Sequence, residues 1–426
     1  MLSLLIIADD FTGALDTGVQ FASTGLRVKV TTDIEFDFRI MQSTDVLVMD
    51  TETRHCSAAQ AYRRVYRIST RAIEYRIQYI LKKTDSGLRG NIGSELTALL
   101  DAAQEKRLPF IPAFPQMKRT TIGGIQYFDG VLVEQSMFGM DPFNPVTTSY
   151  IPDIIGRQSK VPVSVIRRGH HPSISDNARQ IEVYDAETDE DIRRIAKKLH
   201  QEHGLSIMAG CAGLASVLPD ILQLRGGGWP TGVCRGGLLV INGSLNPITA
   251  GQLKNAEHNG FPRVYLRAEQ KLETGYWSTG EGQRMIDFIC SEYRKAGCCI
   301  IDTIDVSGSS ATRAYINERA IPMGQLVKRI PETLGAMAAE IFKRDKTMIP
   351  MVIGGDTLQG ILDSLGVHEI EPICEITPGT VLSVFEQNGE KRQILSKSGG
   401  FGEEGLLIKI ADILSVSADC LKRREL

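Results

Sequence analysis

The sequence predicts an α/β protein of two domains, each built on a mainly parallel sheet flanked by helices. Short apolar runs rich in β-branched residues alternate with segments of helical period, which is the pattern of parallel α/β sheets. The length of 426 residues exceeds what one hydrophobic core usually supports. A glycine-dense stretch without periodicity, residues 225–237, divides the chain in two.

In the first half, the apolar runs predict strands at residues 2–8, 45–49, 77–81, 110–113 and 206–209. Helical period predicts helices at residues 13–23, 57–74, 93–105 and 189–203. Residues 112–146 contain too many prolines and glycines for continuous regular structure, and too many aromatic residues for a flexible linker. We expect an ordered loop with a short hairpin there.

The second half repeats the alternation. Strands are predicted at residues 238–242, 299–302, 347–353 and 393–395, and helices at residues 249–257, 280–296, 335–343, 358–365 and 403–415. We therefore expect a first domain over residues 1–225, a linker over residues 226–236 and a second domain over residues 237–426.

Composition narrows the class of ligand. Hydrophobic residues make up 42% of the chain and charged residues 23%, which is typical of globular proteins. The net charge of -3 and the lack of long runs of like charge argue against nucleic acid or an anionic membrane as partner. No apolar run approaches the roughly 20 residues of a membrane span, so we expect a cytoplasmic protein. Cysteines and histidines show no metal-ligand spacing, and we expect no dedicated metal site.

The first predicted strand ends on two aspartates, Asp9 and Asp10. In open parallel sheets, ligands bind beyond the carboxyl ends of the strands. Successive side chains alternate in direction, so one carboxylate can face that crevice, where it could accept hydrogen bonds from hydroxyls or act as a base. Alternatively, Asp10 or Thr12 caps the helix that begins near Gly13.

Two more strands of this half end in charged loops. Arg54 follows one of them, and the stretch "KTDSGLRGN" after the other carries Lys83, Thr84, Asp85, Ser86 and Arg89. The arginines and the lysine could hold an anionic group, while Asp85 and Ser86 could bind hydroxyls. Any one of these charges could be a solvated surface residue, but three loops at one sheet edge favour a ligand that carries hydroxyls and a carboxylate.

Three glycine-rich loops of the second half each lead from a strand into a helix. Glycine lets a phosphate approach the backbone, and a helix start offers unpaired amides with a positive dipole end. A glycine before a helix is common, but three such loops in one domain favour a phosphate site. The residues expected near phosphate are Ser244, Gly354, Gly355, Asp356, Thr357, Lys397, Gly399 and Gly400.

One further glycine pattern points to a different cofactor. Gly400, Gly402 and Gly405 satisfy the G-x-G-x-x-G pattern of dinucleotide-binding proteins. No clear second strand ending in an acidic residue follows, so the βαβ unit of that fingerprint is incomplete. Binding of NAD is kept as an alternative.

The motifs "IADDFTG", "KTDSGLRGN", "PAFP", "DPFNPV", "GGDT" and "KSGGFG" occur here in the order found in the four-carbon acid-sugar kinases. The chain resembles this family over nearly its whole length. The resemblance implies an amino-terminal acid-sugar-binding domain and a carboxyl-terminal nucleotide-binding domain. It also implies transfer of phosphate from ATP to a hydroxyl of threonate, erythronate or an oxo-tetronate, in a cleft between the domains.

By motif match, the resemblance implies substrate contacts at Asp9, at Arg54 and over residues 83–86. It implies ATP contacts at Ser244, over residues 354–357 and at Gly400. The stretch "GALDTGVQFA" is similar to the D-threonate branch of the family. We therefore expect phosphorylation of D-threonate at its terminal hydroxyl, with a kinase for erythronate or an oxo-tetronate as the alternative.

For the mechanism, we expect magnesium to be shared between the ATP phosphates and water. Asp356, Asp10 and Asp85 are the candidates for the catalytic base, although Asp356 could instead cap a helix. Two other classes of function stay open, an NAD-linked hydroxy-acid dehydrogenase and a non-catalytic sensor of acid sugars. Assembly into a homo-oligomer also stays open.

Overall fold

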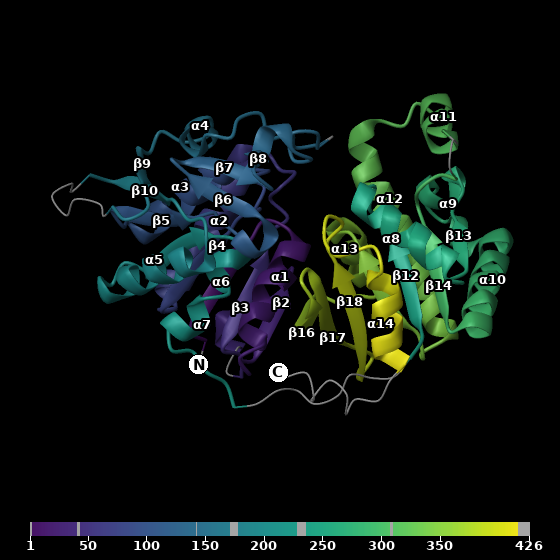
Figure 1. Ribbon diagram of the computed structural model, residues 1–426. Helices are drawn as coiled ribbons and strands as arrows, with labels where there is room; N and C mark the ends of the chain where they lie inside the picture. Colours follow the sequence, from purple (N-terminus) through teal and green to yellow (C-terminus); the bar gives the residue numbers. More distant parts are fainter. Residues whose placement is uncertain are drawn as a thin grey trace. The chain divides into compact units, whose positions relative to one another are not determined.

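The computed structural model describes residues 2–40, 43–141, 143–170, 178–227, 236–306 and 310–415. Its internal contacts form two compact units, Met1–Trp229 and Pro230–Leu426, each an α/β structure with its own sheet (Figure 1). Most of the expected linker, residues 228–235, lies outside the described residues. The predicted fold class, two α/β domains with mainly parallel sheets flanked by helices, is confirmed.

The sheet of the N-terminal unit has the strand order β2-β3-β1-β4-β11-β5-β10-β9, and these neighbours pair in parallel. Because the strands are parallel, the loops after β1, β3 and β4 leave from the same edge. The strands are β1 (Leu4–Ala8), β2 (Val28–Thr31), β3 (Val46–Asp50), β4 (Tyr79–Lys83), β5 (Arg107–Ile111), β9 (Val163–Ile166), β10 (Gln180–Tyr184) and β11 (Ile207–Gly210).

Helices cover both faces of this sheet. Leu5, Ile7, Leu47 and Met49 pack in one core with side chains of α2 and α3, while the alternate strand positions face α1. The helices are α1 (Phe11–Ala22), α2 (Ala58–Glu74), α3 (Ile92–Ala103), α4 (Ile151–Gly156), α5 (Asp189–Gln201), α6 (Ala212–Ala215) and α7 (Leu218–Ile221), with short 3-10 helices at Phe38–Ile40, Pro115–Met117 and Val133–Gln135.

A small antiparallel sheet is inserted between β5 and β9. It consists of β6 (Arg119–Ile122), β7 (Ile125–Phe128) and β8 (Val131–Leu132), in agreement with the predicted short hairpin. The buried guanidinium of Arg119 lies over the rings of Phe128 and Phe138, 4.9 and 5.4 Å from their centroids. Asp185, which follows β10, accepts hydrogen bonds from the amides of Gly123 and Gly124 at the hairpin turn. These contacts join the insertion to the parallel sheet.

The sheet of the C-terminal unit has the order β13-β14-β12-β15-β18-β17-β16. Neighbours from β13 to β18 are parallel, whereas β17 is antiparallel to both β18 and β16. The strands are β12 (Leu238–Asn242), β13 (Arg263–Tyr265), β14 (Cys298–Asp302), β15 (Ile349–Ile353), β16 (Glu369–Thr377), β17 (Thr380–Gln387) and β18 (Glu390–Lys397).

Helices α8 and α14 pack together and contribute to one core of this unit, and α12 packs closely on α13. The helices are α8 (Pro247–His258), α9 (Ala268–Leu272), α10 (Gly280–Ala296), α11 (Ala311–Glu318), α12 (Met323–Arg344), α13 (Gly355–Ser364) and α14 (Leu406–Ser415), with a 3-10 helix at Tyr276–Ser278. The prediction of a helix over residues 335–343 was too short, because α12 continues through Pro331. Proline lacks an amide donor and usually ends a helix, so the part of α12 before Pro331 was not predicted.

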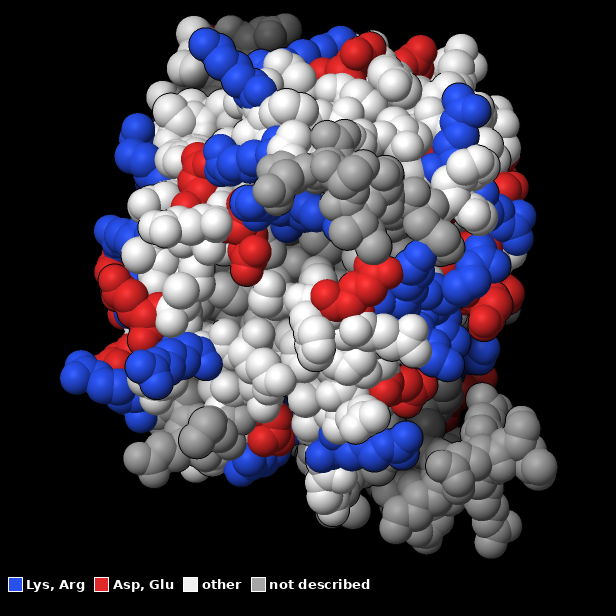
Figure 2. All heavy atoms as spheres, turned by 90° about the vertical axis from the view of Figure 1, so that its left-hand side faces the viewer, with Lys and Arg blue, Asp and Glu red and all other residues white. Residues whose placement is uncertain are grey.

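None of the helices in the described ranges is both long and apolar enough to span a bilayer. On the face shown in Figure 2, acidic and basic side chains both occur, with uncharged surface between them.

A buried ion pair lies beneath the carboxyl end of β1. Lys82 Nζ lies 3.1 Å from Glu95 Oε2, and the two side chains are 0% and 1% exposed. Lys82 also donates hydrogen bonds to the carbonyls of Ile7 and Lys83, and Glu95 accepts a short hydrogen bond from Thr53. Burial raises the pKa of Glu95, against the lowering effect of the Lys82 charge. The pair therefore ties together β1, β4, α3 and the loop after β3.

Replacing Glu95→Gln should lower the unfolding free energy by about 3–5 kcal/mol, because the Lys82 ammonium would stay buried without a counter-charge. Adding Lys82→Met should recover part of this loss, because no buried charge then remains. Urea unfolding of the full chain, followed by circular dichroism, measures both effects. Glu182→Gln is the matched control, because its partner Arg107 is 34% exposed and water can solvate the remaining charge. A Glu95→Gln variant as stable as wild type would contradict this account.

Candidate functional site

Arg54 joins the acidic residues that follow β1. Its Nε donates a hydrogen bond of 2.9 Å to Asp9 Oδ2, and Nη2 donates one of 2.6 Å to Asp10 Oδ1. The same Nη2 lies 3.8 Å from Asp85 Oδ1. The structure thus brings together residues from the loops after β1, β3 and β4.

Asp9 is a buried carboxylate that keeps one oxygen available. Burial alone would raise its pKa, but the positive charges of Arg54, Lys83 and Lys82 lower the pKa below its ordinary value. Within the described ranges, Asp9 Oδ1 accepts no hydrogen bond and lies 3.8 Å from Lys83 Nζ. Asp9 is therefore an ionised acceptor that could receive a hydrogen bond from a ligand hydroxyl.

Lys83 places its ammonium against the start of α1. A Cβ atom at Gly13 would lie 2.3 Å from Lys83 Nζ and 2.5 Å from Asp10 Oδ1, so only glycine leaves room for both groups. Burial alone would lower the pKa of Lys83, but the carboxylates of Asp9 and Asp10 raise the pKa above its ordinary value. Lys83 is therefore a buried cation, charged at neutral pH, at the edge where ligands bind.

Asp10 caps α1, as the simpler alternative expected. Its Oδ1 accepts the Gly13 amide at 3.1 Å in addition to Arg54. The Asp10 carboxylate thus caps the helix and accepts a hydrogen bond from Arg54. Thr12, the other candidate for the cap, lies inside the helix. These two contacts leave Asp10 less free to act as a base than the sequence suggested.

Asp85 is held by Arg89. Arg89 donates to it from the backbone amide, from Nε at 2.7 Å and from Nη2 at 3.1 Å, and Arg89 Nη1 donates to Asp141 at 2.9 Å. Burial raises the pKa of Asp85, but the charges of Arg89 and Arg54 outweigh it and hold that pKa far below its usual range. Such a carboxylate is a weak base, which argues against the catalytic role expected for Asp85.

Thr84 and Ser86 flank Asp85. The Thr84 amide and hydroxyl both donate to the carbonyl of Gly210 on β11, at 2.8 and 3.4 Å, and Thr84 is fully buried. The carbonyl of half-buried Ser86 accepts a hydrogen bond from Gln126 of the inserted sheet. Thr84 therefore fixes the turn, and its hydroxyl is already engaged.

In the C-terminal unit, the three glycine-rich loops follow β12, β15 and β18, whose carboxyl ends lie at one sheet edge. Two close contacts join these loops. A Cβ at Gly243 would lie 1.8 Å from Thr357 Oγ1, and a Cβ at Gly399 would lie 2.3 Å from Ser244 Oγ. Gly399 is therefore required for the loops to approach one another, which is a different reason from the phosphate approach expected for it.

The start of α13 carries the other expected phosphate residues. Gly354 is its N-cap, with φ +113 and no side-chain cap hydrogen bond, so Asp356 is not the capping residue. Gly355, Asp356 and Thr357 form the first turn, where amides point toward the sheet edge with the positive end of the dipole. Asp356 is exposed and Thr357 is buried, while Gly355 and Gly400 are half-buried.

Lys397 points beneath its loop instead of toward the edge. The side chain is buried, and Nζ lies 2.9 Å from the Ser398 carbonyl, 3.5 Å from the Gly399 carbonyl and 3.4 Å from Thr249 Oγ1. Burial lowers the pKa of Lys397 to about 7. Lys397 therefore supports the glycine-rich loop from inside, and the direct phosphate contact expected for it has no support in this geometry.

Sequence reasoning missed three residues that shape the first site. Gly13 leaves space for the Lys83 ammonium. The Lys82–Glu95 ion pair lies beneath the carboxyl end of β1. A glycine in the first turn after an Asp-Asp strand end was a usable signal for a close approach. Glu95 carried no such signal, because an acidic residue in the first turn of a helix is common on surfaces. Among the described residues, no group of three or more His, Cys, Asp and Glu could hold a metal.

The buried lysine makes stability depend on pH. Between about 7, the pKa of folded Lys397, and the ordinary lysine value of 10.5, the unfolded chain binds more protons than the folded chain. The unfolding free energy should therefore rise as the pH increases through this window. Urea unfolding at several pH values measures this, with Lys397→Met as the control in which the increase disappears. If wild type and Lys397→Met change in parallel with pH, the lysine is not the cause.

Comparison with known proteins matches each half of the chain to the model of a known domain family. Residues 4–218 match the family model described as a sugar-binding N-terminal domain, and residues 239–407 match the nucleotide-binding C-terminal domain. Among curated relatives, a D-threonate kinase of Salmonella typhimurium is 28% identical, over 95% of this chain and 97% of its own. A D-erythronate kinase of Heliobacterium modesticaldum is 26% identical, over 89% of each chain. A 3-oxo-tetronate kinase of Cupriavidus necator is 26% identical, over 93% of each.

Solved structures show the same fold. A protein of Salmonella typhimurium LT2 superposes with a TM-score of 0.78 at 21% identity, covering 96% of this chain and 99% of the other. A Haemophilus influenzae protein superposes with a TM-score of 0.70 at 20% identity, covering 97% and 100%. The chain belongs to the four-carbon acid-sugar kinase family, in which a sugar-binding N-terminal domain is followed by a nucleotide-binding C-terminal domain.

Proposed function

We propose that the protein is an ATP-dependent kinase that converts D-threonate to 4-phospho-D-threonate. The observation that carries this proposal is the buried cluster of Asp9, Arg54 and Lys83, which offers both a cation and an ionised acceptor at one sheet edge. A four-carbon acid sugar presents the complementary groups, a carboxylate and several hydroxyls. The names of the curated relatives support a kinase acting on a hydroxyl of such an acid. A cytoplasmic location is part of the proposal.

The choice of D-threonate over erythronate or an oxo-tetronate rests on finer features. Relatives with all three names have similar identity, between 24% and 28%. The identity of 28% to the D-threonate kinase of Salmonella typhimurium favours that substrate. Kinases for erythronate and for oxo-tetronate stay as the alternatives.

On the sugar side, Lys83 is the stronger candidate for the substrate carboxylate. Arg54 already donates to two carboxylates, whereas the ion pair of Lys83 with Asp9 is longer, at 3.8 Å. Asp9 Oδ1 would then accept a hydroxyl beside the carboxylate, and Ser86 lies on the neighbouring turn. Arg54 would help to keep Asp9 ionised, and its hydrogen bonds would hold the carboxylates of Asp9 and Asp10 in position.

On the nucleotide side, the amides of the first turn of α13, together with Ser244 and Gly400, would hold the phosphates. Phosphoryl transfer needs mainly alignment of the acceptor hydroxyl and stabilisation of charge on the moving group. A magnesium ion that arrives with ATP would be shared between the phosphates and water, and it would neutralise phosphate charge.

Asp356 is our candidate for the base. Arg89 holds the pKa of Asp85 far below its usual range, which makes Asp85 a weak base, and the Asp10 carboxylate caps α1. Asp356 is exposed in the first turn of α13, beside the amides proposed to hold the phosphates. Asp356 would take the proton of the acceptor hydroxyl as its oxygen attacks the γ-phosphorus, and the leaving ADP would carry away the bonding electron pair. The proposal requires the two sites to face each other during transfer.

A coupled assay of ADP release tests the function. We expect release that requires both magnesium and a four-carbon acid, with the highest kcat/KM for D-threonate among the threonates, the erythronates and their oxo forms. An absorbance change of added NAD with a hydroxy acid would instead indicate a dehydrogenase. Binding of an acid sugar without either reaction would indicate a sensor.

The Asp356→Asn variant tests the base. Turnover should fall by roughly 100-fold or more while the affinity for ATP stays close to that of wild type, because the amide cannot accept a proton. Asp363→Asn, at the other end of α13, is the matched control and should keep full activity. Normal turnover in Asp356→Asn would refute the assignment of Asp356.

A further inference from the structure

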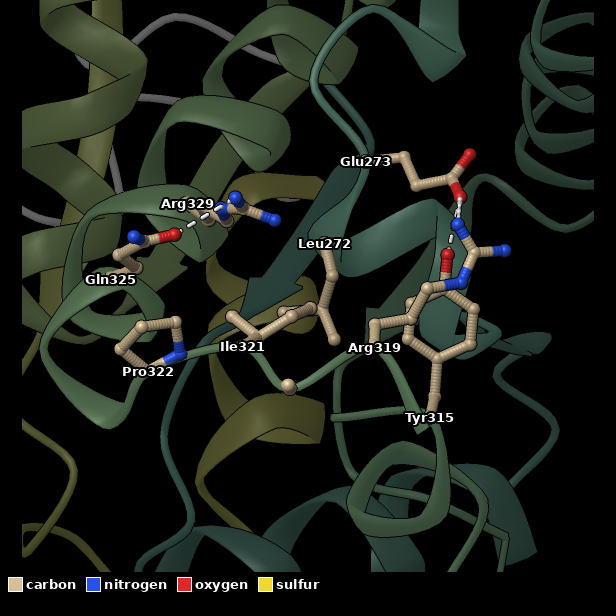
Figure 3. A pocket seen from close by; sticks show the side chains of 9 residues that line it. Leu272, Glu273, Tyr315, Arg319, Ile321, Pro322, Gln325 and Arg329 are labelled. Atoms are coloured by element: carbon tan, nitrogen blue, oxygen red, sulfur yellow. Dashed lines mark hydrogen bonds and ion pairs between the residues drawn. The ribbon is translucent and has the colours of Figure 1, made fainter. Parts of the chain in front are cut away.

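A pocket of about 360 Å³ lies in the C-terminal unit, outside the glycine-rich loops. Figure 3 shows the side chains that form its walls, which come from the end of α9, from α11 and from the start of α12. Leu272, Ile321 and Pro322 supply apolar surface, and Glu273, Tyr315 and Arg319 form a polar wall. This volume is within the range of about 300–1,000 Å³ typical of small-molecule sites.

The polar wall is held in place by its own contacts. Glu273 Oε1 accepts a short hydrogen bond from the Tyr315 hydroxyl and lies 3.5 Å from Arg319 Nη1. The Arg319 guanidinium lies 4.9 Å from the centroid of the Tyr315 ring. Both of these contacts are made by Oε1 of Glu273. Oε2 can therefore accept a hydrogen bond beside the donors of Arg319.

A buried lysine fixes the frame of the pocket. Lys271 Nζ donates to the Thr303 carbonyl at 2.9 Å, and to Asp305 and Thr312 at 2.6 Å each. Lys271 precedes the pocket residue Leu272, and Thr312 lies in the first turn of α11. The end of α9, the loop after β14 and α11 are therefore joined, which preorganises two walls of the pocket.

The pocket is formed by segments that follow neighbouring strands at the same sheet edge as the glycine-rich loops. Helix α9 follows β13 and α11 follows β14, and both strands run parallel to β12, which precedes the Ser244 loop. Strands are spaced about 4.8 Å apart, so β14 and β13 lie roughly 5 and 10 Å beyond β12. A ligand with phosphates on the loops after β12, β15 and β18 can therefore extend over β14 toward the pocket. On the other side, β17 is antiparallel and offers no helix start at this edge.

We propose that this pocket holds the purine base of the nucleotide that donates the phosphoryl group. The inference rests on the proposed kinase function. A purine edge carries a hydrogen-bond donor next to an acceptor, which matches the pairing of Glu273 Oε2 with Arg319. The apolar side chains would cover the ring face, and the guanidinium of Arg319 would lie against the ring edge.

Arg319→Ala, which removes one polar partner of the base, tests the inference. Affinity for ATP should fall by about 10-fold or more, because the base would lose a hydrogen bond to a charged group. Affinity for inorganic triphosphate, which has no base, should not change. Ligand protection of the full-length protein against thermal unfolding measures both ligands, including weak binders. Arg313→Ala, an exposed arginine on the same helix outside the pocket, is the matched control.

Ile321→Ser provides a second test if Arg319→Ala fails to fold, and it should weaken ATP and spare triphosphate in the same way. Equal loss of both ligands, or loss of neither, would overturn the assignment of the pocket. Wild-type protein that is protected by neither ATP nor triphosphate would overturn the kinase proposal itself. Protection of wild type by triphosphate as strong as that by ATP would show that no base site exists.

Discussion

The N-terminal site depends on one compensation of charge, the contact of the Arg54 guanidinium with Asp9 and Asp10. Two adjacent carboxylates at the end of a buried strand repel each other, and burial by itself would raise the pKa of Asp9. Arg54 offsets both effects, because it donates to each carboxylate from a different nitrogen. The loop that carries Arg54 is fixed in turn from below, through the hydrogen bond from Thr53 to Glu95 and the ion pair with Lys82. The position of Arg54 therefore depends on the buried Lys82–Glu95 ion pair beneath its loop.

The anion-binding groups that we propose differ in kind between the two domains. The N-terminal domain uses full side-chain charges, which suit a small ligand that carries a carboxylate among hydroxyls, because donors and acceptors are then needed side by side. In the nucleotide site that we propose for the C-terminal domain, backbone amides at a helix start would suit the spread charge of phosphates. Lys397 illustrates the difference. Burial lowers the pKa of Lys397 to about 7. Its side chain donates a hydrogen bond to the carbonyl of Ser398 and so holds the loop from inside.

Local patterns were enough to predict the parallel sheets, most helices and the loops in which candidate residues lie. The β-branched runs and the turn residues are encoded within a few positions, and the strand ends at Ala8 and Ile353 follow from them directly. What could not be predicted depends on tertiary contacts. The capture of Asp85 by Arg89 and the inward direction of Lys397 need the folded loop. The β16–β17 hairpin was missed because Pro372 and exposed charges weaken its alternating pattern.

The close approach at Gly13 has a consequence for how this chain can vary over evolutionary time. Even the smallest side chain, a methyl group, would occupy the space taken by the Lys83 ammonium and the Asp10 carboxylate. Glycine is therefore the residue that fits as long as the lysine and the aspartate both keep these positions. A lineage that lost Lys83 would still have the Asp10 carboxylate 2.5 Å from that methyl group, so both side chains would have to change or move before the glycine could be replaced.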